Sequence, residues 1–151
     1  MVNNNEKSES GVKLRGEELQ FMRDFARLTG AVPRDCVIDG NERIIFVVRA
    51  GEAGRVIGKG GANIKHVREV FKREVNVVEY DEKPENFVKN ALAPAKIKNV
   101  SVVEQKDGKR VSVVDVDPED RGRAIGKNGR NIGRARILAR RHFGIEDIIL
   151  A

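Results

Sequence analysis

Hydrophobic and polar residues in the first half of the chain follow the period of a helix and then that of strands. Apolar positions three and four apart in Leu19–Ala26 predict an amphipathic helix that ends near Gly30. The apolar runs Cys36–Ile38 and Ile44–Val48, separated by turn residues, predict a β-hairpin. Met1–Arg15 has no such periodicity, so we expect a disordered tail.

The second half of the chain repeats this order. Pro84–Leu92 predicts a helix, and Ile97–Glu104 and Arg110–Val116 predict strands joined by an Asp107-Gly108 turn, a dipeptide typical of hairpins. In both halves a Gly-rich segment, a helix and a strand follow. In the first half the apolar face of the expected helix is Ile64, Val67, Val70 and Phe71, and the expected strand is Val75–Glu79. In the second half the face is Ile132, Ala135, Leu138 and Ala139, and the strand is Ile145–Leu150.

These patterns predict an α+β fold of two tandem units, residues 16–80 and 81–151, each with the order α-β-β-α-α-β. A chain of 151 residues suits two units of about 70 residues each. Only Asp81–Lys83 separate the predicted units, and three residues are too few for a free tether. We therefore expect the units to be rigidly joined.

The two Gly-rich segments are copies of one another. Residues 52–65 align with residues 120–133 without a gap, 68 positions apart, and eight of the fourteen positions are identical. The identical pairs are Gly54/Gly122, Arg55/Arg123, Ile57/Ile125, Gly58/Gly126, Lys59/Lys127, Gly61/Gly129, Asn63/Asn131 and Ile64/Ile132. This period exceeds that of solenoid repeats, so it indicates two similar small domains.

The basic residues gather in the same segments. The chain has 29 Lys and Arg against 23 Asp and Glu, a net charge of +6. Residues 52–76 carry +3 and residues 118–142 carry +6, while the rest of the chain is slightly acidic. An excess confined to two windows is typical of a surface that binds a polyanion. Aromatic residues make up only 5%, and we expect Phe46 and Phe71 to pack in the core.

Several classes of protein are excluded by composition. Cys36 is the single cysteine and His66 and His142 are the two histidines, so no internal disulfide and no Cys/His metal cluster can form. No segment approaches the ~20 apolar residues of a membrane span, and Met1–Gly11 is too polar for a signal peptide. We expect a cytoplasmic protein with no membrane partner, no metal and no cofactor.

Each repeated segment contains a Gly-x-x-Gly corner, Gly58–Gly61 and Gly126–Gly129. Glycine permits positive φ and has no Cβ, so a phosphodiester backbone can approach the main chain. The following helix presents its N-terminus to a phosphate, and Lys59 and Lys127 add a cation at the same point. The alternative is a structural helix-turn-helix corner. Two copies with lysine at the same position favour a nucleic-acid contact.

The residues around these corners resemble a known signature. Val56–Ile64 and Ala124–Ile132 resemble the signature of the KH domain, a module that binds single-stranded nucleic acid, and the preceding helix and strands are similar to its type II version. Asn90–Lys96 and Ala124–Asn131 are similar to the tandem KH portion of NusA transcription elongation/termination factors in their short archaeal form. Bacterial members add a polymerase-binding domain and an S1 domain, and we expect neither within these 151 residues.

The resemblance implies a non-enzymatic factor for transcription elongation, termination and antitermination that grips nascent single-stranded RNA, with RNA polymerase as a further candidate partner. A KH Gly-x-x-Gly loop clamps about four nucleotides, so two units would accept about eight. The bases are expected in an aliphatic groove between the flanking helices and the sheet. The candidate RNA contacts are Arg55, Ile57, Gly58, Lys59, Gly60, Gly61, Ile64, Lys65, Arg123, Ile125, Gly126, Lys127, Asn128, Gly129, Arg130, Ile132 and Arg134.

Two other functions fit parts of the sequence. The same fold could bind ribosomal RNA, which would make the protein a ribosome-associated or ribosome-assembly factor. Gly54, Gly58 and Lys59 superficially resemble a nucleotide-binding P-loop. That motif, however, needs four residues between its glycines and a Ser or Thr after the lysine, whereas this chain has three residues and then Gly60. We therefore do not expect an enzyme.

Some side chains admit a structural role beside the RNA-binding one. We expect the four isoleucines of the repeated segments to pack mainly in the core, with some of them lining the floor of the groove. Asn63 and Asn131, just inside a helix, fit a local hydrogen bond as well as an RNA contact. Arg136, Arg140 and Arg141 are left out of the candidate site because they fit a solvated helix face.

Overall fold

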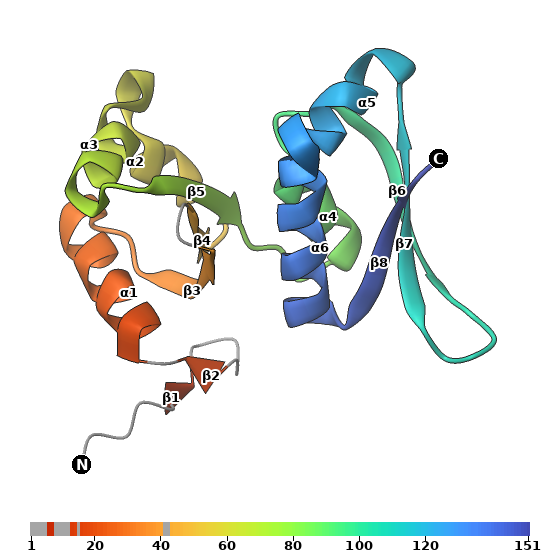
Figure 1. Ribbon diagram of the computed structural model, residues 1–151, viewed down its shortest axis with the longest axis horizontal. Coiled ribbons are helices and arrows are strands. Elements are labelled where there is room, and N and C mark those ends of the chain that lie inside the picture. Colours follow the sequence, from red (N-terminus) through yellow and green to blue (C-terminus); the bar gives the residue numbers. More distant parts are fainter. Residues whose placement is uncertain (1–5, 8–12, 15, 41–42) are drawn as a thin grey trace. The chain divides into compact units, whose positions relative to one another are not determined.

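The computed structural model describes residues 6–7, 13–14, 16–40 and 43–151 (Figure 1). The chain divides into two compact units, Met1–Tyr80 and Asp81–Ala151. Most of the predicted tail, and Asn41 of the predicted hairpin turn, lie outside the described residues. Within the predicted tail the structure describes two short antiparallel strands, β1 (Glu6–Lys7) and β2 (Lys13–Leu14).

The first unit is a three-stranded sheet with helices. Its elements are α1 (Gly16–Thr29), β3 (Pro33–Asp39), β4 (Arg43–Val48), α2 (Ala53–Ile57), a 3₁₀ turn (Lys59–Gly61), α3 (Ala62–Phe71) and β5 (Glu74–Glu79). The strand order is β3-β4-β5, with β3 antiparallel and β5 parallel to the central β4. The parallel pair requires a crossover connection, and α2 and α3 provide it.

Aromatic residues dominate the core of this unit. Phe25 of α1 and Phe46 of β4 are fully buried and stack with ring centroids 4.0 Å apart. Phe71 at the end of α3 lies 6.0 Å from Phe46 and 5.3 Å from Phe21, measured between centroids. The rings therefore fix α1 and α3 on one face of the sheet (Figure 1), and the predicted core roles of Phe46 and Phe71 are confirmed.

The second unit repeats the first. Its elements are α4 (Pro84–Ala91), β6 (Ile97–Glu104), β7 (Arg110–Val116), α5 (Pro118–Ile125), a 3₁₀ turn (Lys127–Gly129), α6 (Arg130–Phe143) and β8 (Ile145–Leu150). The strand order is β6-β7-β8, again with one antiparallel and one parallel pair. Phe87, Leu138 and Ile148 are at most 1% exposed and form part of its core, and α4 and α6 lie on one face of the sheet (Figure 1).

The α+β class and the element order α-β-β-α-α-β are as predicted from the sequence. The helical stripe of α3 is narrower than predicted, because the Val70 side chain is 49% exposed. The two copies also differ in length, since α3 has 10 residues and α6 has 14. Among the described residues, none of the helices combines the length and the hydrophobicity that crossing a membrane requires.

Candidate nucleic-acid interface

The two Gly-x-x-Gly loops have the same main-chain conformation. Gly58 has φ 76° and ψ 171°, and Gly126 has φ 77° and ψ 168°. Two residues after this glycine, the main chain of each loop enters the left-handed region, at φ 64° in Gly60 and at φ 57° in Asn128. Each loop is closed by a main-chain hydrogen bond of 3.1 Å between its two glycines, in which the second donates to the first. The repeat in sequence is thus a repeat in conformation.

The first glycine of each loop is required by a close approach between segments. A Cβ added to Gly58 would lie 2.7 Å from Cγ of Asn63, and one added to Gly126 would lie 2.7 Å from Cβ of Asn131 and 2.8 Å from its main-chain nitrogen. Real Cβ atoms essentially never come this close. The chain can therefore fold back from α2 to α3, and from α5 to α6, only with glycine at this position.

The asparagines beside these glycines stabilise the corner. Asn63 Nδ2 donates to the carbonyl oxygen of Arg55 at 2.9 Å, and Asn131 Nδ2 donates to that of Arg123 at 3.0 Å. Asn131 also reaches the carbonyl oxygen of Leu92 at 2.8 Å, which ties the end of α4 to α6. Of the two roles left open by the sequence, the local hydrogen bond is the one that these contacts support.

Exposed cations surround each loop. Lys59 and Lys127 are exposed at the loop tips. The Arg55 and Arg123 side chains are 62% and 66% exposed, and each lies near the acidic residue three positions before it, with N···O distances of 3.6 Å and 3.5 Å. The guanidinium groups are themselves exposed and each has five N–H donors, so both can still meet a phosphate.

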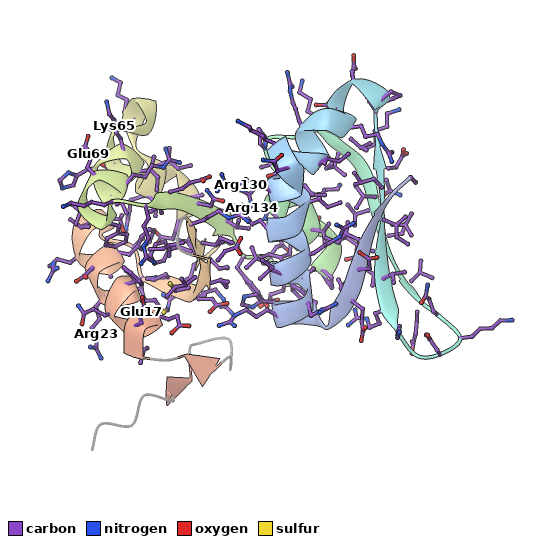
Figure 2. All side chains as sticks on the ribbon, in the orientation of Figure 1. Glu17, Arg23, Lys65, Glu69, Arg130 and Arg134 are labelled. Atoms are coloured by element: carbon purple, nitrogen blue, oxygen red, sulfur yellow. The ribbon has the colours of Figure 1, made fainter. Side chains whose placement is uncertain are left out.

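Further basic side chains follow along the helices. Lys65 is exposed on α3, and Figure 2 shows it on the same side of that helix as Glu69. Arg130 and Arg134 project from one side of α6 (Figure 2). These positions continue the positive charge of the loops along the helix in each unit.

An open groove runs beside the second loop. Its volume is about 430 Å³. The lining residues are Arg121, Ile125, Gly129, Ile132, Arg136, Asp147, Ile148, Ile149 and Leu150. They come from α5, the loop, α6 and β8, which is the edge strand of the sheet. The lining combines aliphatic side chains with the charged side chains of Arg121, Arg136 and Asp147.

The four isoleucines of the repeated segments separate into two pairs. Ile64 and Ile132 are each 6% exposed and belong to the core, as expected, and Ile132 also lines the groove. Ile57 and Ile125 are 41% and 37% exposed, so the expectation that they pack mainly in the core is wrong. Both occupy the last position of their helix, α2 or α5, directly before the loop.

Arg134 is engaged within the second unit. Its Nη2 donates to the carbonyl oxygens of Ala91 at 2.9 Å and Ala93 at 2.8 Å, and to Oδ1 of Asn131 at 2.6 Å. The side chain therefore holds the connection between α4 and β6 against α6. A role of Arg134 in RNA binding stays a prediction.

Sequence reasoning missed the contribution of the final strand and of one arginine. Ile149 is 45% exposed on β8 and lines the groove together with Arg136. Arg136 Nε lies 3.0 Å from Oδ1 of Asp147, and its Nη2 donates to the carbonyl oxygen of Ile148 at 3.2 Å. The Arg136 side chain is 47% exposed, so it lies on a solvated helix face and also bonds to β8. The repeat offered one signal, because Arg136 aligns with Arg68 at the same spacing of 68 residues.

Three carboxylates gather at the start of α5. Asp117, Glu119 and Asp120 each place one oxygen within 4.8 Å of the others. Two of them are already paired with cations. Lys98 Nζ lies 2.8 Å from Asp117, and this hydrogen bond raises the pKa of Lys98. Asp120 lies beside Arg123 and also accepts from the main-chain nitrogen of Lys96 at 3.4 Å. These contacts support a structural role in joining β6 to α5.

A three-stranded mixed sheet whose parallel strands are joined by two helices and a Gly-x-x-Gly corner defines a KH domain, and the chain contains this arrangement twice. Comparison with family models agrees. Residues 24–107 match the KH domain, and residues 84–150 match the NusA-like second KH domain.

Comparison with individual proteins narrows the assignment. The chain is 41% identical over 139 residues to the probable transcription termination protein NusA of Halobacterium salinarum, covering 92% of this chain and 98% of that protein. It is 39% identical over 121 residues to the transcription termination/antitermination protein NusA of Mycobacterium tuberculosis, covering 69% of this chain and 33% of that protein. The crystal structure of APE1850 is similar at 40% identity and a TM-score of 0.79, covering 89% of this chain and 98% of that one. The chain belongs to the NusA family.

Proposed function

We propose that this protein binds single-stranded RNA through its two Gly-x-x-Gly loops and acts on the nascent transcript as a factor for transcription elongation, termination and antitermination. The observation that carries the proposal is the duplicated loop, which has one main-chain conformation in both units and an exposed lysine at the same position. A strand of RNA can place its phosphates against the loop because no side chain covers Gly60 or Gly129.

The surroundings of the second loop support RNA as the ligand. A phosphate held at Lys127 leaves the attached bases beside Ile125 and the groove of about 430 Å³. The groove is lined by aliphatic residues instead of exposed aromatic rings, so bases would be held by apolar contact and by hydrogen bonds to their edges. No covalent step is part of the proposal, and the protein acts by binding alone.

The role in transcription rests on the relatives. Proteins that match nearly the whole chain are named as probable transcription termination proteins. The longer mycobacterial relative is named for both termination and antitermination. RNA polymerase is a candidate partner on the same ground, and the direct ligand that we infer from the loops is the transcript.

Paired loop variants test the RNA-binding site. Lys59→Asp/Gly60→Asp and Lys127→Asp/Asn128→Asp should each weaken binding to a 20-nucleotide random-sequence RNA about 10²-fold, measured by fluorescence anisotropy. Folding should be preserved, since an added Cβ at Gly60 meets no atom within 4 Å and Asn128 shows that the second loop accepts a side chain at φ 57°. Circular dichroism checks this.

A matched control separates the loop from the net charge. Lys106→Asp/Lys109→Gln changes the charge by the same amount as Lys59→Asp/Gly60→Asp, at an exposed turn between β6 and β7. This control should keep most of the affinity of the parent protein. RNA binding at the level of the parent in both loop variants would show that the site is elsewhere.

Crosslinking in cells tests the biological target. Ultraviolet crosslinking and sequencing of the bound fragments should recover nascent transcripts, and the double variant in both loops should lose them. Recovery of ribosomal RNA in their place would favour the ribosome-associated alternative with the same loops.

A further inference from the structure

The groove of the second unit continues beyond the residues that face the loop. A second open cavity, of about 840 Å³, lies along the same α6–β8 seam and shares Arg136 and Asp147 with the first. Its other lining residues are Ile137, Arg140, Arg141 and Glu146. A continuous surface therefore leads from Gly129 at the loop to the C-terminal end of α6.

This continuation depends on the extra length of α6. In the first unit the helix after the loop ends at Phe71, and the next residue, Lys72, takes the left-handed conformation at φ 55°. In the second unit the helix runs on to Phe143 and is 14 residues long instead of 10. Four more residues add about 6 Å of helix, and Arg140 and Arg141 lie on this added turn. The extension is thus a property of the second unit.

Both units have an arginine one turn before this extension, Arg68 or Arg136, and its hydrogen bond to the following strand is the same in both. Arg68 Nη2 donates to the carbonyl oxygen of Val75 at 3.1 Å, and Arg136 Nη2 donates to that of Ile148 at 3.2 Å. In the second unit Arg140 continues the row, with Nη2 donating to the carbonyl oxygen of Glu146 at 3.1 Å. The arginines of α6 thus bond to the main chain of the edge strand β8, and that edge presents guanidinium groups.

These guanidinium groups retain donors for a ligand. A guanidinium has five N–H donors in a rigid plane, and the contacts described here occupy two in Arg136 and one in Arg140. Both arginine side chains are exposed. Because the strand already orients them, fewer rotamers are lost when a phosphate binds. Three arginines face two carboxylates, Glu146 and Asp147, so the surface is cationic by one charge.

We propose that Arg136, Arg140 and Arg141 form an additional phosphate-binding surface that holds about one or two RNA phosphates beyond the four nucleotides clamped at the second loop. The proposal rests on the proposed RNA binding of that loop. RNA is the occupant because the surface is continuous with the groove. A strand that leaves the groove along α6 reaches these arginines without a break.

The test compares short and longer RNA in a protein whose first loop is silenced. The full chain carrying Lys59→Asp/Gly60→Asp is titrated with fluorescein-labelled random-sequence RNAs of 5 and 9 nucleotides. Adding Arg140→Gln/Arg141→Gln should weaken binding of the 9-mer about five- to tenfold and that of the 5-mer less than twofold. The slope of log K against log salt for the 9-mer should become shallower by about 1.4, because two phosphate contacts on a single strand are lost.

Two further variants complete the design. Lys106→Gln/Lys109→Gln removes the same two charges from the exposed β6–β7 turn and should affect both RNAs alike and weakly. Glu146→Gln removes an exposed carboxylate of the cavity and should strengthen binding of the 9-mer about twofold. This second effect has the opposite sign, so a general loss of folding cannot produce it.

The outcomes are distinct. Equal losses for the 5-mer and the 9-mer, or losses no larger than in the Lys106/Lys109 control, would overturn the extension and leave the binding at the loop intact. A protein with an intact second loop that binds neither RNA would overturn the proposed function and the extension with it.

Discussion

At the residue scale, one hydrogen atom in place of a methyl group decides how closely the helices of each unit can meet. Gly58 and Gly126 face Asn63 and Asn131 at distances that leave no room for a Cβ. The glycines at the loop tips have another reason. An added Cβ at Gly60 or Gly129 would meet no atom within 4 Å, so their positive φ values are what favour glycine there. The close approach therefore predicts that alanine is costly at Gly126 but not at a glycine that has helical φ and free space for a Cβ.

Gly126→Ala should lower the free energy of unfolding by about 2 kcal/mol, because the new Cβ would lie 2.8 Å from the main-chain nitrogen of Asn131 at a φ of 77°. Gly122→Ala, four positions earlier within α5, should raise it by about 0.5 kcal/mol, since the position is helical and no atom lies within 4 Å of an added Cβ. Urea unfolding followed by circular dichroism measures both. Equal effects of the two substitutions would contradict the close-approach argument.

Asn131→Ala should lower the free energy of unfolding by about 1–2 kcal/mol. The substitution removes the amide group that donates to the carbonyl oxygens of Arg123 and of the buried Leu92. Asn63→Ala should have a smaller effect, since its described hydrogen bond is to Arg55 alone. The same urea titration tests the order. Asn99→Ala, at an exposed position of β6, is the control and should change the stability by less than about 0.5 kcal/mol.

Side-chain environments could be predicted from the sequence only where one element decides them. Ile64 and Ile132 lie on the apolar stripe of a helix, and the stripe predicted their burial correctly. Ile57 and Ile125 end short helices, and their exposure depends on how the chain turns at the following glycine. Val70 fits the stripe by spacing and yet is 49% exposed, whereas Leu138 at the equivalent position of the longer helix α6 is fully buried. The spacing of apolar residues along the chain therefore does not predict the exposure of these three side chains.

At the scale of elements, α6 organises the second unit. Its N-terminal half contacts the loop and the connection from α4 to β6, and its C-terminal half lines β8. Arg134 is the main link to the connection, through the carbonyl oxygens of Ala91 and Ala93. Such charge-assisted hydrogen bonds are stronger than neutral ones, so the connection should depend on this side chain.

Arg134→Gln should therefore increase hydrogen–deuterium exchange in residues 91–96 and lower the stability of the second unit by about 1.5–3 kcal/mol. The RNA affinity of the Arg134→Gln protein should change less than twofold if the guanidinium acts only inside the domain. Lys65→Gln, at an exposed position on α3, should give the reverse pattern of weaker RNA binding with unchanged exchange. A large loss of RNA affinity in Arg134→Gln without increased exchange would assign Arg134 to the RNA contact.

Element order was predictable because strands and turns are local signals. Asp107-Gly108 between β-rich runs marks the hairpin of the second unit, and β6 and β7 have the predicted bounds. The resemblance implied a groove between the helices and the sheet, but the residues that line it could not be predicted from local signals. The groove requires β8 to lie at the edge of the sheet beside α6, and this depends on strand pairing between residues far apart in sequence. The contribution of Arg136 and Ile149 follows from that pairing.

At the scale of the whole molecule, the protein carries the same Gly-x-x-Gly loop, the proposed RNA clamp, twice on one chain. Each unit has its own loop, its own cations and its own sheet, so each should bind RNA independently. Two clamps on one RNA bind more tightly than either alone, because the second contact forms at a high effective concentration. The gain is available only to an RNA long enough to reach both loops.

RNA length and salt should therefore act together. On a 20-nucleotide random-sequence RNA the parent protein should bind about 10²-fold more tightly than either single-loop variant, whereas on a 5-nucleotide RNA the three proteins should differ by less than about threefold. The slope of log K against log salt for the 20-mer should be about twice as steep in the parent, since the affinity for a single strand changes with a slope of about −0.7 per neutralised phosphate and both loops contribute phosphates. Fluorescence anisotropy at a series of salt concentrations gives both quantities. If one single-loop variant keeps the affinity and the slope of the parent, the altered loop makes no RNA contact, and the duplicated conformation serves the fold in that unit alone.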